Sequence, residues 1–172
     1  MNIHPIFVHF PIALMTLYAI AELIRHKKLA DTVYWFHVKA ILVITGTLTA
    51  FLALSTGDDA EHLLKADLRP LINMHANFAA ASTLIFGFIA LIYLIVWIKK
   101  SELDQQLSKS LIGDMWKSIS NIANYILKTS TIMIVLALIG LIAITITGGL
   151  GGAIVYGPNV DPIVGFIYHL FF

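Results

Sequence analysis

Residues 70–98, PLINMHANFAAASTLIFGFIALIYLIVWI, contain no Asp, Glu, Lys or Arg side chain. Such a run exceeds the about 20 helical residues that cross the roughly 30 Å hydrocarbon core of a bilayer. Backbone groups in lipid must find their hydrogen-bond partners within the segment itself, and this constraint favours a helix. The stretch therefore predicts a transmembrane helix over residues 70–98.

Three further stretches of the chain also lack charged side chains, and they cover residues 1–21, 40–57 and 129–160. Each is long enough, or nearly so, to cross a bilayer, so we predict further transmembrane helices over about residues 5–25, 36–56 and 128–150. The predicted fold is an all-α integral membrane protein. It is a single domain over residues 1–172, built as a bundle of four transmembrane helices.

The composition agrees with a membrane protein, because 59% of the residues are apolar and only 12% are Asp, Glu, Lys or Arg. That charged share is about half the usual share for a soluble domain. The apolar content excludes disorder. The absence of cysteine excludes disulfide scaffolds, thiolate zinc sites and cysteine-ligated iron–sulfur clusters. A formal net charge of +1 offers little to phosphate groups, so we expect no nucleic-acid partner.

Lysine and arginine are distributed unequally over the predicted loops. Nine lie in the segments that join the first helix to the second and the third to the fourth, whereas only Lys65 and Arg69 lie on the other side. Basic residues accumulate on the cytoplasmic side of membranes, so we expect both termini on the outer side. If the chain is in a bacterial inner membrane, as we expect, that side is the periplasm. The basic cluster at residues 25–28 follows the first apolar run, which is therefore expected to be a retained helix and not a signal peptide.

Between the third and fourth predicted helices, residues 101–127 have apolar side chains at every third or fourth position. Polar side chains fall largely between them, which is the pattern of an amphipathic helix. We predict that this helix lies on the inner membrane surface as a connector, with Trp116 at the interface. A docking surface for a soluble partner is the alternative. The apolar positions are Leu103, Leu107, Leu111, Met115, Ile119, Ile122 and Ile126.

Histidine is the most informative residue in this apolar chain, which contains seven. His9 and His75 lie inside charge-free runs, each shortly after a proline that can begin a helix. Both helices are expected to begin outside, so the two imidazoles are expected at a similar depth. Two facing histidines are a simple way to bind a haem iron at both axial positions. We therefore predict that His9 and His75 are the ligands of a b-type haem between the first and third helices.

Other residues near this pair fit the same prediction. Ala13 and Ala79 lie one turn deeper than the two histidines and are small enough to leave room for a porphyrin. His4 is an alternative ligand or a hydrogen-bond donor to a propionate. Arg69 could pair with a propionate, although a long side chain at this depth could equally extend to lipid headgroups.

The histidines also allow interpretations without haem. Each ring could make one structural hydrogen bond near the interface, and His9 with His75 could bind a non-haem metal ion or relay protons. A second haem at the inner side would use His26 and His37, although an aromatic belt at residues 34–36 explains that region equally well. No role is assigned to His169. The spacing of one mixed cluster does not match a known metal site, and we expect it to form a solvated loop. Its members are Asp58, Asp59, Glu61 and His62.

Glycines make the outer end of the fourth predicted helix smooth, at positions 148, 149, 151 and 152. A surface of this kind suits close packing against another element. It also suits a place where the backbone approaches a ligand. The sequence leaves both possibilities open.

The opening HPIFVHFPIAL at residues 4–14 resembles the HPxxVHFPIAL motif of one bacterial membrane family, called domain of unknown function 2231. The TGD at 56–58, the HAN at 75–77 and the GGLGGAIVYG at 148–157 resemble its weaker motifs. Residues 158–160 depart from the glycine-rich ending of the family. The resemblance implies a four-helix membrane module of unsettled function, sometimes joined to Rieske or cytochrome c-like domains, and so suggests redox chemistry.

These observations lead to an expected function. The chain is predicted to be a membrane cytochrome b or the haem-bearing subunit of a redox complex, an electron-transfer protein more than a stand-alone enzyme. Its expected partners are the lipid bilayer, a periplasmic electron carrier or quinone, and further subunits or copies of the chain. The alternatives are a cofactor-free scaffold or assembly subunit, and a membrane protein that binds a metal ion through His9 and His75.

Overall fold

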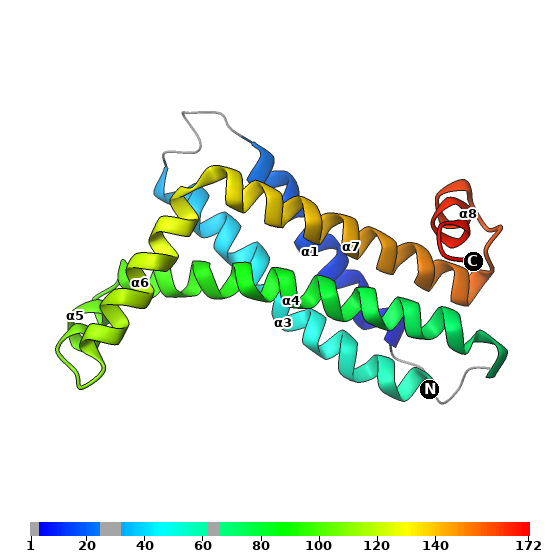
Figure 1. Ribbon diagram of the computed structural model, residues 1–172, viewed down its shortest axis with the longest axis horizontal. Helices are drawn as coiled ribbons and strands as arrows, with labels where there is room; N and C mark the ends of the chain where they lie inside the picture. Colours follow the sequence, from blue (N-terminus) through cyan, green and yellow to red (C-terminus); the bar gives the residue numbers. More distant parts are fainter. Residues whose placement is uncertain (1–3, 25–31, 62–65) are drawn as a thin grey trace.

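The computed structural model describes residues 4–24, 32–61 and 66–172, and all regular structure in these residues is helical. Four of the helices are long and apolar enough to cross a membrane, which confirms the predicted fold (Figure 1). Their ends lie within three residues of the predicted ends, except that the second and the fourth extend further, to Glu61 and Tyr156. They are α1 (His4–Leu23), α3 (Val33–Glu61), α4 (Arg69–Lys99) and α7 (Ser130–Tyr156).

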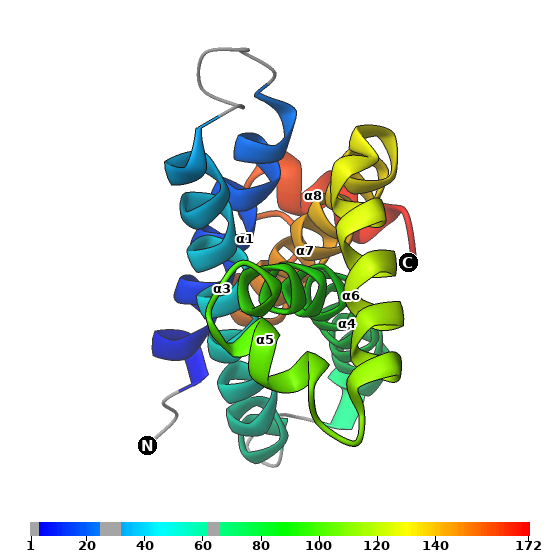
Figure 2. The same cartoon turned by 90° about the vertical axis from the view of Figure 1, so that its left-hand side faces the viewer.

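The four long helices run alternately in opposite directions and form a closed ring. Each packs against the next along the chain, and α7 packs back against α1, so α1 and α4 lie diagonally opposite (Figure 2). We call the end where α1 and α4 begin the histidine end, because it carries His4, His9 and His75. The opposite end is called the basic end, and it carries Lys39, Lys99, Lys100, Lys109, Lys117 and Lys128.

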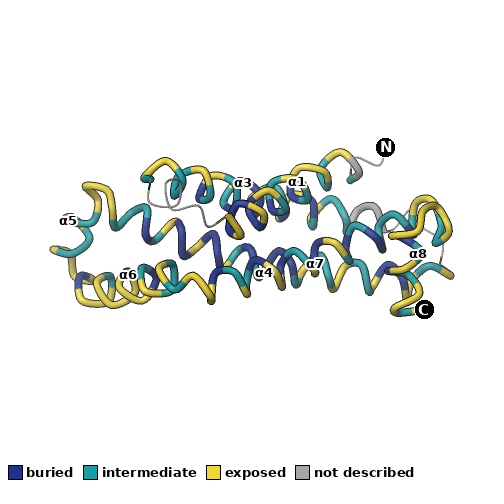
Figure 3. Tube along the Cα trace, turned by 90° about the horizontal axis from the view of Figure 1, so that it is seen from above, coloured by how far each residue is buried: buried dark blue, intermediate teal, exposed yellow. Residues whose placement is uncertain are grey.

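Buried residues lie on the sides of the helices that face one another (Figure 3). Many large apolar side chains are nevertheless exposed. Met15, Tyr18, Phe86 and Tyr93 are fully buried at the centre. Leu84, on the outer face of α4, is 70% exposed, as expected of a side chain that contacts lipid. Glycine lets α7 approach α4 closely, because a Cβ atom at Gly140 would lie 2.9 Å from the Phe86 ring.

The connector between α4 and α7 consists of two helices, where the sequence predicted one. They are α5 (Leu103–Ser108) and α6 (Gly113–Lys128). The chain turns tightly between them, since a Cβ atom at Gly113 would collide with the carbonyl oxygen of Ser108. The indole Nε1–H of Trp116 donates a 2.8 Å hydrogen bond to Asp104, so this side chain joins the two helices.

The amphipathic character predicted for the connector is present in α6. Gly113, Ser120 and Ala123 are buried against the bundle. Met115 and Ile122 are exposed on another face, each 57% accessible. The periodicity of apolar residues therefore identified the helix correctly, but it carried no information about the turn at Gly113.

The fourth long helix continues to Tyr156, six residues beyond the predicted end at 150. A short helix that was not predicted follows it, α8 (Pro162–His169). Asp161 caps α8, accepting hydrogen bonds from the backbone N–H groups of Ile163 at 2.8 Å and Val164 at 3.0 Å. Val164 and Ile167 then pack on the glycines of α7. The glycines at positions 149 and 152 therefore leave room for α8 to pack on α7.

The packing of α8 predicts a specific effect of alanine at Gly149. A Cβ atom there would collide with Ile167, so Gly149→Ala is expected to destabilise the docked α8 by about 1–3 kcal/mol. Hydrogen–deuterium exchange of α8 in the detergent-purified chain measures this effect. Gly148→Ala is the matched control, because a Cβ atom at Gly148 meets nothing within 4 Å. Equal protection of α8 in both variants would contradict the packing.

Candidate functional site

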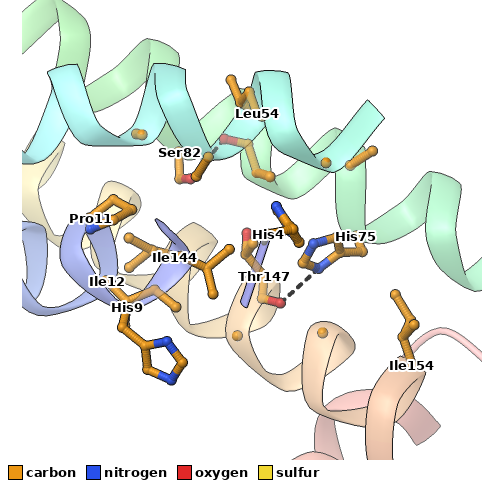
Figure 4. A pocket seen from close by; sticks show the side chains of 18 of the residues that line it. His4, His9, Pro11, Ile12, Leu54, His75, Ser82, Ile144, Thr147 and Ile154 are labelled. Carbon is orange, nitrogen blue, oxygen red and sulfur yellow. Dashed lines mark hydrogen bonds between the residues drawn. The ribbon is translucent and has the colours of Figure 1, made fainter. Parts of the chain in front are cut away.

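A cavity of about 450 Å³ lies among the four long helices toward the histidine end (Figure 4). Its walls are mostly apolar, and many of the lining residues are small, as is usual where a ligand lies close to helix backbones. Its volume falls within the range of about 300–1,000 Å³ typical of small-molecule and cofactor sites. The small lining residues include Ala50, Ala53, Ala76, Ala79, Gly148 and Gly152.

His75 reaches this cavity from the second turn of α4, and α7 fixes its ring. Its Nδ1 atom lies 2.9 Å from the carbonyl oxygen of Thr147. A carbonyl can only accept, so Nδ1 carries the proton and Nε2 has a free lone pair. A Cβ atom at Gly151 would lie 3.1 Å from Cε1 of His75, so glycine at this position lets the ring rest against α7.

His4 reaches the same cavity from the first residue of α1, and it is held by α3 in a similar way. The hydroxyl of Thr56 donates to the carbonyl oxygen of Ala53 at 3.0 Å, and Nδ1 of His4 lies 3.1 Å from the same hydroxyl oxygen. A Cβ atom at Gly57 would lie 3.3 Å from the His4 ring. Each of the two rings thus has a threonine oxygen and a glycine beside it.

The histidines at this end are not arranged as the sequence suggested. His4 and His75 share one side of the cavity, close enough to interact electrostatically, whereas the His9 ring points away from both (Figure 4). His9 lines the margin of the cavity and is exposed. The structure therefore brings His4, and not His9, beside His75. Whether either ring ligates a haem stays a prediction.

The other residues proposed for the site divide into two groups. Ala79 lines the cavity. Ala13 and Arg69 are exposed and lie outside the lining. Thr56, Gly57 and Thr147 were not predicted as parts of a site, and Gly151 was one of the glycines for which the sequence left close packing and approach to a ligand open. All of these except Thr147 occur in the family-like segments. The sequence feature that could have indicated them is a threonine close to a glycine on a helix that faces a histidine.

The remaining histidine predictions have different outcomes. His26 and His62 lie outside the described residues, as do the side chains of the predicted solvated loop. His37 contacts Trp97 in an edge-to-face arrangement at 5.0 Å, and its Nδ1 atom bonds to the carbonyl oxygen of Val33 at 2.8 Å. Within the described residues, no three His, Asp or Glu side chains are grouped so that they could hold a metal ion.

The fold and the cavity together define a class, a four-helix membrane protein with two oriented imidazoles in an apolar cavity. The chain belongs to the family described as "Predicted membrane protein (DUF2231)", whose model matches residues 1–161. Helix α8 lies beyond the matched residues. No curated protein and no solved structure matches the chain significantly.

The environment of His4 predicts lower stability in acid. Burial lowers the pKa of His4 below its ordinary value of 6.5, against an opposing hydrogen bond with the Ala53 backbone. The unfolded chain then binds this proton more readily than the folded chain does. The stabilising contribution is complete above pH 6.5 and is lost as the pH falls through the lowered pKa of the folded protein.

Thermal unfolding of the detergent-purified chain on both sides of pH 6.5 tests this prediction. The midpoint is expected to be lower in acid, with a smaller difference in His4→Gln. His169→Gln is the control, because that side chain is exposed on α8. A pH dependence unchanged in His4→Gln would show that the burial of His4 makes no such contribution.

Proposed function

We propose that the chain is a membrane-embedded b-type cytochrome, or the haem-bearing subunit of a larger redox complex, with haem in the cavity at the histidine end. The observation that carries the proposal is the hydrogen bond that orients the His75 ring in the cavity. Histidines that ligate a metal almost always donate the other ring N–H to a carbonyl, a carboxylate or water. His75 has this arrangement, with Nδ1 on the Thr147 carbonyl and Nε2 available.

The surroundings of His75 also suit a haem. The walls are apolar and rich in alanine and glycine, so a flat ring can approach the helix backbones. A bound haem would supply one-electron transfer, and its potential would depend on the axial ligands, burial and hydrogen bonds to the ligands. The Thr147 carbonyl raises the basicity of the His75 ring and fixes its orientation. His4 is the first candidate for a second ligand because its ring lies on the same side of the cavity as His75, and His9 is the other.

The proposal includes an orientation in the membrane. The basic end would face the cytoplasm of a bacterium and the histidine end the periplasm, because lysines gather at the basic end. Electrons would then pass between the cavity and a periplasmic carrier or a quinone. The chain would act as an electron-transfer protein within a homo-oligomer or a larger membrane complex.

A reduced-minus-oxidised optical spectrum of the full chain, purified from haem-replete cells, tests the proposal. We expect sharp visible bands and about one haem b per chain in a pyridine haemochrome assay, as two histidine ligands require for one haem. His75→Ala is expected to remove the haem or change its spectrum, and His169→Ala, far from the cavity lining, is expected to change neither. Comparison of His4→Ala with His9→Ala identifies the second ligand.

Two results would overturn the proposal. One is a folded chain that contains no haem, and the other is a haem spectrum that His75→Ala leaves unchanged. Metal analysis of the same haem-free preparation separates the two alternatives, a protein that binds a metal ion and a cofactor-free scaffold subunit.

The glycine beside His75 offers a subtler test of the same site. Gly151→Ala would place a Cβ atom 3.1 Å from Cε1 of His75 and push the ring away from α7. We expect an altered haem spectrum or midpoint potential with the ligand still present, because the ring orientation and its hydrogen bond both change. Gly87→Ala is the control, because Gly87 lies outside the cavity lining and a Cβ atom there would meet only Thr47, at 3.6 Å. An equal effect of both variants would contradict the proposed position of the His75 ring.

A further inference from the structure

A buried carboxylate lies at the opposite end of the bundle from the cavity. Glu22, in the last turn of α1, is only 2% exposed. Among the charged side chains that the structure describes, it is the only buried one. Burial of an ionised carboxylate in a membrane-spanning bundle is costly unless hydrogen bonds and an opposite charge compensate for the lost water.

Donors from three helices meet at one oxygen atom of this carboxylate. The hydroxyls of Tyr18 and Tyr93 lie 3.3 Å and 3.1 Å from Oε2 of Glu22. The ammonium group of Lys39 lies 3.0 Å from the same oxygen. Because Tyr18 is on α1, Lys39 on α3 and Tyr93 on α4, the cluster joins three of the four long helices.

A purely structural role explains such a cluster poorly. Buried ion pairs often stabilise a protein no better than apolar side chains of similar volume, because desolvation cancels the attraction. The neighbouring core is apolar, and Tyr18 and Tyr93 already pack edge to face at 5.8 Å. Ionisable groups within membrane-spanning helices are rare and usually serve ion or proton movement.

The partners of Glu22 can satisfy both of its protonation states. A tyrosine hydroxyl can donate to a carboxylate, and after rotation it can accept from a protonated carboxylic acid. Lys39 has a flexible stem, and its side chain is 15% exposed, so its ammonium group can turn toward water. An arginine would have held the carboxylate in a more rigid, two-pronged pair.

The titratable surroundings of Glu22 in the described residues come from three elements. Tyr18 faces it from its own helix, Lys39 from α3 and Tyr93 from α4. Helix α7, which closes the ring, contains no Asp, Glu, Lys, Arg or His, and its only tyrosine is Tyr156 at the histidine end. We expect the exchange of a proton at Glu22 to involve this cluster and the water at the basic end.

We propose that Glu22 is a proton-binding site that exchanges with the aqueous phase at the basic end, with Lys39, Tyr18 and Tyr93 as its positioning residues. The Glu22 carboxylate takes up one proton from that water and becomes a carboxylic acid. A tyrosine hydroxyl turns to accept its hydrogen bond, and Lys39, still charged, moves toward the water. No electron moves in this step. The site is independent of haem binding, so failure of either proposal leaves the other standing.

Infrared difference spectroscopy of the full chain in lipid vesicles, between alkaline and acidic buffer, tests this proposal. The expected result is a carbonyl band of a protonated, buried carboxylic acid that shifts in deuterated buffer. The band is expected to be lost in Glu22→Gln and kept in Asp114→Asn, since Asp114 is an exposed carboxylate on α6. Tyr93→Phe is expected to shift the band without removing it, because one hydrogen-bond partner is lost.

If the Glu22→Gln variant fails to fold, a second measurement on the wild-type chain tests the same proposal. Carboxyl-labelled glutamate shifts the band of the wild-type chain, in which Glu22 is one of three glutamates beside Glu61 and Glu102. A labelled band that also responds to Tyr93→Phe belongs to Glu22. If no buried glutamate band appears at any pH at which the chain stays folded, Glu22 is a fixed ion-pair partner and the proposal is wrong.

Discussion

The hydrogen bond from Nδ1 of His75 to the carbonyl oxygen of Thr147 organises the histidine end of the bundle. It joins α4 to α7, and it decides which nitrogen of the ring is available in the cavity. It requires close approach of the ring to the backbone of α7, which the glycine at position 151 permits. The cavity between the helices, and any chemistry in it, depends on this contact.

The glycine-rich end of α7 serves two neighbours at once. Gly149 contacts Ile167 of α8, Gly148 and Gly151 face the cavity, and Gly152 lines the cavity and also contacts Val164 of α8. Both interpretations that the sequence left open, close packing and space for a ligand, therefore apply to this end of the helix. Because each turn of a helix contains about 3.6 residues, neighbouring glycines point in different directions.

The four membrane-spanning helices could be predicted because bilayer thickness imposes a length and an absence of charge that are visible in a single sequence. The turn at Gly113 and helix α8 could not, because both depend on contacts between residues distant in the sequence, such as Trp116 with Asp104 and Ile167 with Gly149.

The candidate site was predicted only in part. His75 was identified from its place in an apolar run, and the cavity near it has the expected small residues. The partner of His75 could not be chosen from depth alone, because depth gives no direction around the helix. His4 and His9 are five residues apart, so their side chains project from α1 about 140° apart. The cluster around Glu22 was missed because its members are far apart in the chain and near the ends of predicted helices.

The two ends of the bundle thus carry different chemistry, separated by an apolar core around Met15, Phe86 and Ile89. Two imidazoles held through their Nδ1 atoms face a cavity at the histidine end, and an ion pair with two tyrosines lies at the basic end. The proposed function rests on haem bound in the cavity through His75. A crystal structure of the full chain from haem-replete cells tests it most directly. We expect bound haem in the cavity with Nε2 of His75 as its ligand, and a cavity filled by lipid or collapsed around His75 would contradict the proposal.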